Sequence, residues 1–148
     1  MTMELAKNKK AFFDYEIQEK MEAGLVLTGA EVKSVRNGQV NLKGSYITFY
    51  NDQAFMIGAH ISAYKPAGPQ KDYDPTRTRR LVIRKREIRY LQAKSQEKGL
   101  TIIPLSIYTK QRFIKVEIGV GRGKKEFDKR ESIKKRDLDR DIRNFSEA

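Results

Sequence analysis

Apolar and polar residues alternate with a period of two along much of the chain, a pattern typical of half-buried β-strands. Phe13, Tyr15 and Ile17 alternate with polar neighbours, and the run from Ile114 to Val120 alternates in the same way. Asn51-Asp52-Gln53 separates two other apolar runs and favours a tight turn between antiparallel strands. The pattern therefore predicts about six short strands, mostly antiparallel, within residues 13–28, 45–64, 78–83 and 100–121.

Two segments break this period and carry helix signals instead. Thr28 lies three residues before Glu31, which is the spacing of a capping box, and Asn37-Gly38 provides a helix stop. A second helix is predicted over about 85–98, because its apolar residues share one face and Gly99 follows.

The segments between these elements have no clear period. Residues 1–11 are polar and contain several lysines, so we expect a loose N-terminal arm. Residues 65–76 hold three of the four prolines and are expected to form a long exposed loop. The elements together predict a mainly β fold, a small closed or partly closed barrel for which the oligonucleotide-binding fold is the commonest RNA-reading example. We expect the barrel domain over 1–122.

Residues 123–148 form a run of charges with little to bury. Acidic and basic residues lie three or four positions apart, as in Glu131 with Lys134 and Asp139 with Arg143, but such pairs contribute only about 0.2–0.5 kcal/mol each. We therefore expect a tail that is disordered in the free protein and becomes helical against an anionic partner.

The net charge favours nucleic acid as that partner. The chain carries 31 Lys and Arg against 19 Asp and Glu, a formal charge of +12. Residues 76–98 alone hold nine basic residues against two glutamates, and tyrosines are interleaved with basic residues, as base stacking requires. A protein that is merely basic and an anionic membrane surface are the alternatives, but a membrane-surface helix usually has aromatic anchors and the chain has no tryptophan.

Size and composition exclude several other classes. The 148 residues suit one domain with an appendage, and no apolar run approaches the ~20 residues that span a bilayer. The N-terminus lacks the apolar stretch of a signal peptide, so we expect a cytoplasmic protein without a membrane partner. The absence of cysteine excludes disulfides and thiolate metal sites.

Catalytic signals are weak. His60 is the single histidine, and a lone histidine on a strand is more often structural than a catalytic base. The glycines of GVGRGKK lie two residues apart, which does not match a nucleotide-binding loop, and they are expected instead to let a strand leave the barrel freely. The sequence indicates no enzyme, metal, cofactor or small-molecule substrate.

Seven stretches follow one another along the chain: NKKAFFDYEI, EAGLVLTGAEVKSVRNGQVNL, SYI, DPTRTRRLVIRKREI, KGLTIIPLSIY, KVEIGVGRGKKEFDKRE and IKKRD. Together they resemble the small protein B family, the protein partners of transfer-messenger RNA. The resemblance implies a six-stranded, oligonucleotide-binding-like barrel with two to three short helices. It also implies trans-translation: delivery of this RNA to ribosomes stalled on messages that lack a stop codon.

The resemblance further implies which residues do this work. The barrel would grip the tRNA-like domain of the RNA, with Asn8, Lys9, Lys10, Tyr15, Glu22, Arg77, Arg79 and Arg80 as candidates. The tail would enter the decoding centre and empty mRNA channel of the small ribosomal subunit and contact ribosomal RNA. Its candidates are Lys124, Lys125, Phe127, Asp128, Lys129, Arg130, Lys134, Lys135 and Arg136.

Two other classes are weighed against this interpretation: a ribosomal or general single-strand-binding barrel, and an RNA-modifying enzyme. The enzyme is disfavoured because the sequence offers no convincing base or metal site. Nothing in the sequence indicates more than a monomer.

Overall fold

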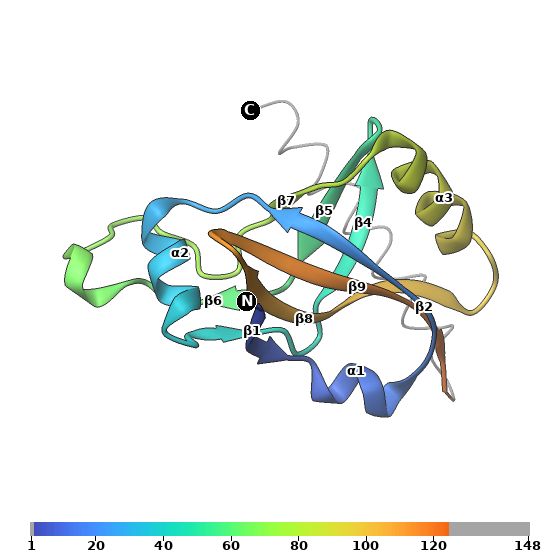
Figure 1. Cartoon of the computed structure of the whole chain (residues 1–148), viewed down its shortest axis with the longest axis horizontal. Coiled ribbons are helices and arrows are strands. Elements are labelled where there is room, and N and C mark those ends of the chain that lie inside the picture. The colour runs from blue at the N-terminus through green and yellow to red at the C-terminus, as the bar shows by residue number, and fades with distance from the viewer. Residues whose placement is uncertain (1, 125–148) are drawn as a thin grey trace.

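In the computed structural model, which describes residues 2–124, six strands close into a ring (Figure 1). In order round the ring they are β8 (Leu100–Lys110), β4 (Tyr46–Tyr50), β5 (Gln53–Ile57), β7 (Arg79–Val82), β2 (Tyr15–Leu25) and β9 (Phe113–Gly123), which pairs back with β8. All of these pairings are antiparallel. The predicted six-stranded barrel is confirmed, although β2, β8 and β9 are longer than expected, at 11 residues each.

The apolar face of each strand points into the ring. The alternation of β9 buries Ile114, Val116, Ile118 and Val120, and β8 contributes its own buried isoleucines. Fully burying an aliphatic side chain of this size stabilises a fold by about 1.5–3 kcal/mol. The barrel interior is therefore a packed core, and any ligand surface must lie on its outside.

Two helices lie at opposite ends of the barrel (Figure 1). Helix α2 (Gly29–Arg36) inserts Val35 into the core at one end, and α3 (Lys85–Ser95) inserts Ile88 and Leu91 at the other. The capping box of α2 is confirmed, since Thr28 Oγ1 accepts from the Glu31 amide at 3.2 Å and the Glu31 carboxylate accepts from the Thr28 amide at 2.9 Å. Helix α3 ends three residues before the predicted boundary.

The prediction of a loose N-terminal arm is wrong for the described part of the arm. Strand β1 (Thr2–Lys7) pairs with the C-terminal half of β8, and α1 (Lys9–Asp14) follows directly. The strand predicted from Phe13 therefore begins only at Tyr15. Phe13 lies in the last turn of α1 with 78 % of its surface exposed, so its place in the apolar alternation has no counterpart in the core.

The remaining elements are two very short strands and one long loop. Strands β3 (Val40–Asn41) and β6 (His60–Ile61) form a separate two-stranded sheet beside α2. The proline-rich segment 65–76 contains one 3-10 turn, η1 (Lys65–Ala67), and is otherwise irregular, as predicted.

Helix α1 packs on the outside of the barrel, against β2 and β8. Ala11 of α1 joins Ile103 and Leu105 of β8 in a second apolar cluster. A Cβ at Gly119 would lie 2.7 Å from a Leu105 methyl, and one at Gly121 would lie 3.0 Å from the Tyr15 Cβ. Gly119 and Gly121 therefore make room for the Leu105 and Tyr15 side chains of this cluster, and at these two positions the prediction that the glycines free the strand to leave the barrel is wrong.

Within residues 2–124, no helix combines the length and the apolar character needed to cross a membrane. The predicted tail lies outside the described residues, apart from Gly123 at the end of β9 and Lys124. The amides of these two residues bond to the carbonyls of Gly99 and Asp14, so the strand is held up to its last described residue.

Candidate nucleic-acid interface

A row of four residues crosses the outside of the barrel. Gly24 of β2 lies opposite Val82 of β7 on one side and Lys115 of β9 on the other, and Lys115 lies opposite Tyr108 of β8. Glu22, two residues before Gly24 on β2, faces the same way. We call these five residues the outer-strand surface.

The centre of the outer-strand surface is open because Gly24 has no side chain. A Cβ there would lie 3.4 Å from the Val82 Cβ and 3.8 Å from the Lys115 ammonium. Val82 is 57 % exposed, which is high for an aliphatic residue in the middle of a sheet. The row thus places an exposed apolar side chain beside a cation, with no side chain between them at Gly24.

Glu22 is the anion of this surface and is held by two donors. The Tyr108 hydroxyl donates a short hydrogen bond to its carboxylate, and the Lys110 ammonium lies 3.4 Å from both carboxylate oxygens. The hydrogen bond from Tyr108 lowers the pKa of Glu22, partial burial opposes that effect, and Lys110 adds to it. Conversely, burial and then the bond to Glu22 raise the pKa of the Tyr108 hydroxyl. The carboxylate stays ionised and keeps acceptor sites for amino or ribose donors.

A second group of predicted residues gathers around α1. Lys9 and Lys10 are exposed at the start of α1, and Lys10 pairs with Asp14 at 3.0 Å. Tyr15 is half-buried in the apolar cluster beneath the helix. The ring of Phe12 lies between two further cations, with the Lys7 and Lys20 ammonium groups 5.2 and 5.7 Å from its centre.

Asn8 does not fit the predicted role of RNA contact, because it is 4 % exposed and its side chain is fully used inside the protein. Its carbonyl caps α1 by accepting from the Ala11 amide at 3.2 Å. Its amide nitrogen donates to the Pro104 carbonyl at 2.9 Å and the Leu42 carbonyl at 3.2 Å. Asn8 therefore joins β1, α1 and β8 and fixes the start of the helix that carries Lys9 and Lys10.

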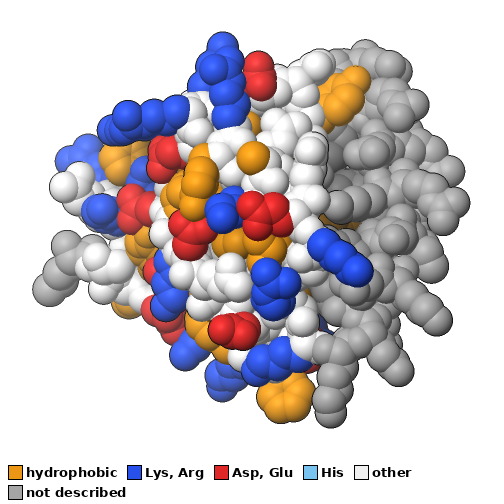
Figure 2. All heavy atoms as spheres, turned by 90° about the vertical axis from the view of Figure 1, so that its right-hand side faces the viewer, with side chains coloured by type: hydrophobic (Ala, Val, Ile, Leu, Met, Phe, Trp, Pro, Cys, Tyr) orange, Lys and Arg blue, Asp and Glu red, His pale blue; other side chains and the backbone are white. Residues whose placement is uncertain are grey.

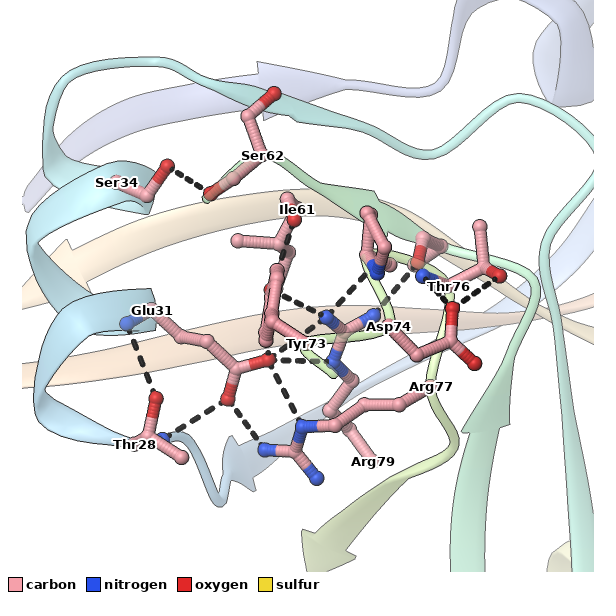
Figure 3. Close-up of polar contacts among 12 residues, drawn as sticks. Thr28, Glu31, Ser34, Ile61, Ser62, Tyr73, Asp74, Thr76, Arg77 and Arg79 are labelled. Atoms are coloured by element: carbon pink, nitrogen blue, oxygen red, sulfur yellow. Dashed lines mark hydrogen bonds and ion pairs between the residues drawn. The ribbon is translucent and has the colours of Figure 1, made fainter. Parts of the chain in front are cut away.

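Arg77 and Arg79 form a third group, which centres on Glu31 of α2 (Figure 3). The Glu31 side chain is 1 % exposed and receives both guanidinium groups, that of Arg79 at 2.7 Å and that of Arg77 through a short ion pair. Tyr73 donates to the Ile61 carbonyl at 2.8 Å and lies 3.1 Å from Glu31. We call Glu31, Tyr73, Arg77 and Arg79 the Glu31 network.

The predicted phosphate contact by Arg79 is wrong for this conformation, because the Arg79 side chain is completely buried. Besides Glu31, it donates to the carbonyls of Ala59 at 2.7 Å and Pro75 at 2.9 Å. It thus fixes the end of the proline-rich loop to the barrel. Burial acts to raise the pKa of Glu31, but the bonds from Arg77, the Thr28 amide and Arg79 outweigh it and lower the pKa to about 2.

Arg80 points the other way along β7 and is exposed. A basic stretch follows at the start of α3 and contains four exposed cations: Arg84, Lys85, Arg86 and Arg89. None of them forms an ion pair with another of residues 2–124. Figure 2 shows the face that includes α3, with Lys and Arg side chains spread over it and Asp and Glu between them. Residues 1–124 hold 23 of the 31 basic and 12 of the 19 acidic residues, so the barrel part carries almost the entire net charge.

The structure therefore brings the predicted residues into four places rather than one, and it adds four candidates that the sequence did not indicate. Gly24, Val82, Tyr108 and Lys115 were missed because their juxtaposition depends on the register of four strands. The one local signal in the sequence was that basic residues flank Val82, and the exposure of Val82 appears only in the structure. Apart from Lys124, the predicted ribosome-contacting residues lie outside the described part of the chain.

The described residues hold no group of three or more His, Asp or Glu side chains placed to share a metal ion. His60 is exposed at the start of β6 and pairs only through the backbone with Asn41. The outer surface of the described residues combines exposed cations, a hydrogen-bond acceptor and an apolar side chain.

The ring, the end-capping helices and this exterior define a small β-barrel of the oligonucleotide-binding-like class. A family model described as "SmpB protein" matches residues 5–147. The SsrA-binding protein of Leuconostoc mesenteroides is 51 % identical over 138 residues, covering 93 % of this chain and 89 % of the relative. That of Chloroflexus aggregans is 49 % identical, covering 93 % and 87 %. This chain belongs to the SmpB family, as the sequence motifs predicted.

The fold agrees with that assignment. A chain from the solved structure described as "tmRNA-SmpB: a journey to the center of the bacterial ribosome" is 40 % identical, with a TM-score of 0.68. The match covers 86 % of this chain and 93 % of the other.

Proposed function

We propose that this protein binds transfer-messenger RNA through its barrel and delivers it to stalled ribosomes in trans-translation. The single observation that carries the proposal is membership of the SmpB family over residues 5–147. Relatives named SsrA-binding proteins and the similar chain described with transfer-messenger RNA and the bacterial ribosome support the two partners.

The outer-strand surface is the part of the barrel best suited to a folded RNA. Lys115 and Lys110 supply phosphate contacts, Glu22 accepts hydrogen bonds from base or ribose, and Val82 beside Gly24 provides an apolar contact. Lys9, Lys10 and Tyr15 flank it through α1, and Arg80 with the start of α3 extends the basic area. A generic polyanion could satisfy only the lysines of this surface. A folded RNA can also place a base or ribose against Glu22 and Val82, so these contacts favour a folded RNA.

We assign the second activity, sensing the vacant mRNA channel, to residues 123–148. This segment contains nine basic and seven acidic residues, so its net charge is small. A nearly neutral segment adds little non-specific attraction to RNA. Its role must therefore depend on particular side chains, with Phe127 and the Asp128-Lys129-Arg130 motif as the candidates.

The test separates the two activities in the full-length chain. Replacing Lys129 and Arg130 by alanine should leave affinity for the tRNA-like domain within about twofold while abolishing peptide tagging on stalled ribosomes. Replacing Val82 by aspartate should weaken RNA binding by about tenfold or more, since a single unfavourable contact costs about 1–3 kcal/mol. Normal tagging by the Lys129 and Arg130 variant would overturn the tail assignment, and unchanged RNA affinity of Val82→Asp would move the interface elsewhere.

A general single-strand-binding barrel behaves differently in the same assays. Its affinity would follow the number of charges and would be indifferent to the shape of the RNA. Equal loss of binding on replacing any two exposed lysines, with no special effect at Val82, would favour that class.

A further inference from the structure

The Glu31 network has more hydrogen-bond donors than its carboxylate can use. Six donor contacts reach the two oxygens: one from the Thr28 amide, one from Tyr73, two from Arg77 and two from Arg79. An ionised carboxylate offers about four lone-pair sites. The Tyr73 hydroxyl has one proton and a closer acceptor at the Ile61 carbonyl, yet the five remaining donors still exceed the sites.

The network also carries an excess positive charge. Two guanidinium groups face one carboxylate, and arginine does not lose its proton in proteins. Asp74, the other carboxylate in Figure 3, accepts from the Thr76 amide and hydroxyl at 2.9 and 3.0 Å and forms no ion pair with either arginine. An unbalanced charge in a largely buried cluster is unfavourable unless an anion is available to complete it.

The two arginines differ in how easily they can leave. Arg79 is 0 % exposed and also holds the Ala59 and Pro75 carbonyls. Arg77 is 31 % exposed, and apart from Glu31 it makes one long bond, at 3.3 Å, to the carbonyl of Thr78. If Arg77 turns away, Glu31 keeps the Thr28 amide on one oxygen and two N–H groups of Arg79 on the other, so both oxygens still have donors.

We propose that Arg77 is an exchangeable phosphate contact, held on Glu31 in the free protein and transferred to a phosphate of bound RNA. The exchange restores charge balance on both sides, because Glu31 and Arg79 remain as a neutral pair and Arg77 neutralises the phosphate. It rests on the RNA binding proposed above and adds a second anchor at the α2 end of the barrel. Arg77 precedes Val82 by five residues, roughly 15 Å along an extended chain.

The exchange has a consequence that a permanently exposed arginine would not have. Glu31 holds the Arg77 side chain in place until an anion competes for it. The side chain is therefore already ordered before RNA binds, which reduces the entropy lost on binding. The proline-rich loop stays attached throughout, because Tyr73 and Arg79 hold it without Arg77.

The most direct test follows the Nε–H signals of Arg77 and Arg79 by ¹⁵N NMR in the full-length protein. Both groups donate to Glu31, at 2.9 and 3.1 Å, so both should be protected from exchange in the free protein. Three probes are added separately: inorganic phosphate, the tRNA-like domain of transfer-messenger RNA, and an unrelated RNA duplex. The Arg77 signal should shift with the RNAs while the Arg79 signal stays. No shift at Arg77 with bound RNA, or equal shifts at both arginines, would overturn the exchange.

A substitution series gives a second readout. Arg77→Ala should reduce the slope of log affinity against log salt by about one unit, as expected for one lost phosphate contact. Its urea midpoint should fall much less than that of Arg79→Met. Arg36→Ala is the matched control, since Arg36 is an exposed arginine at the end of α2 whose guanidinium bonds the Arg112 carbonyl at 3.1 Å and not Glu31. An equal change of slope in the control would mean a diffuse field effect and would refute a specific contact.

The outcomes separate this inference from the function on which it rests. If Arg77 responds alike to both RNAs and the protein does not prefer the tRNA-like domain, the exchange stands and the proposed function fails. If the tRNA-like domain binds selectively and Arg77 does not respond, the function stands and the exchange fails.

Discussion

Replacing Arg79 by methionine tests whether this arginine stabilises the fold or binds RNA. Methionine keeps much of the aliphatic volume and removes the guanidinium that bonds Glu31 and the carbonyls of Ala59 and Pro75. Removing one partner of a buried ion pair costs about 3–5 kcal/mol. Glu31 retains Arg77, which reduces the loss, while each carbonyl left without a donor adds about 1–3 kcal/mol. We therefore expect a loss of about 3–5 kcal/mol.

That loss is easily measured. In a protein of this size 1 kcal/mol corresponds to about 2–4 °C, so the melting temperature should fall by roughly 10–15 °C. Urea unfolding followed by far-UV circular dichroism gives the free energy, and the slope of RNA affinity against salt is measured at a temperature where the variant is folded. The slope should not change, because the Arg79 side chain has no exposed surface.

Arg80→Met is the control, since Arg80 is the exposed neighbour on the same strand. Its unfolding free energy should stay within about 0.5 kcal/mol of the parent, and its salt slope should fall by about one unit. The reasoning is refuted if Arg79→Met is as stable as the parent while its salt slope falls, because Arg79 would then contact RNA directly.

Three further predictions concern stability. The pKa of Glu31 is lowered to about 2, so its ionised carboxylate contributes fully to the free energy of unfolding above about pH 4.5. This contribution, on the order of 3 kcal/mol by urea unfolding, should be lost as the pH falls towards 2. A Glu31→Gln variant should lack this pH dependence, and equal pH profiles for the two proteins would contradict the prediction. Gly119→Ala should destabilise by about 1–3 kcal/mol because its methyl would meet Leu105, whereas Gly29→Ala, where nothing lies within 4 Å, should be neutral or slightly stabilising; equal effects would argue against this packing. Thr28→Ala should cost about 1 kcal/mol in the same assay through loss of the α2 cap, and an unchanged midpoint would mean that water replaces it.

Local pattern was sufficient for much of the barrel. The alternation that ends at Val120 predicts β9 because one face of that strand packs on the core, so period and burial coincide. The capping box at Thr28 and Glu31 predicts α2 because its hydrogen bonds join residues three apart. In both cases the sequence signal and the stabilising contact lie within the same few residues.

The N-terminus shows where local pattern fails. Asn8 caps α1 through the nearby Ala11 amide, but its own side chain is oriented by bonds to carbonyls 34 and 96 residues away, so the local sequence does not show that this cap forms and interrupts the alternation. Strand β1 likewise depends on pairing with β8, about 100 residues later. Such contacts appear only once the barrel is closed.

The candidate site was predictable in chemistry and not in arrangement. The excess of arginine in DPTRTRR indicates an anionic partner, yet the same composition conceals a division of roles, because Arg79 is buried against Glu31, 48 residues earlier, and Arg80 is exposed. Strand alternation separates these two adjacent arginines. The outer-strand surface depends on the register of β7, β2, β9 and β8, which no single stretch of sequence specifies.

The central claim is that the barrel recognises the folded shape of one RNA through a surface that is only partly charged. The most direct measurement is competition at moderate salt between the tRNA-like domain of transfer-messenger RNA and random-sequence RNA of equal length, using the full chain. The account predicts a preference of at least about a hundredfold, which shrinks towards non-specific affinity in Val82→Asp. Equal affinities for the two RNAs would contradict it.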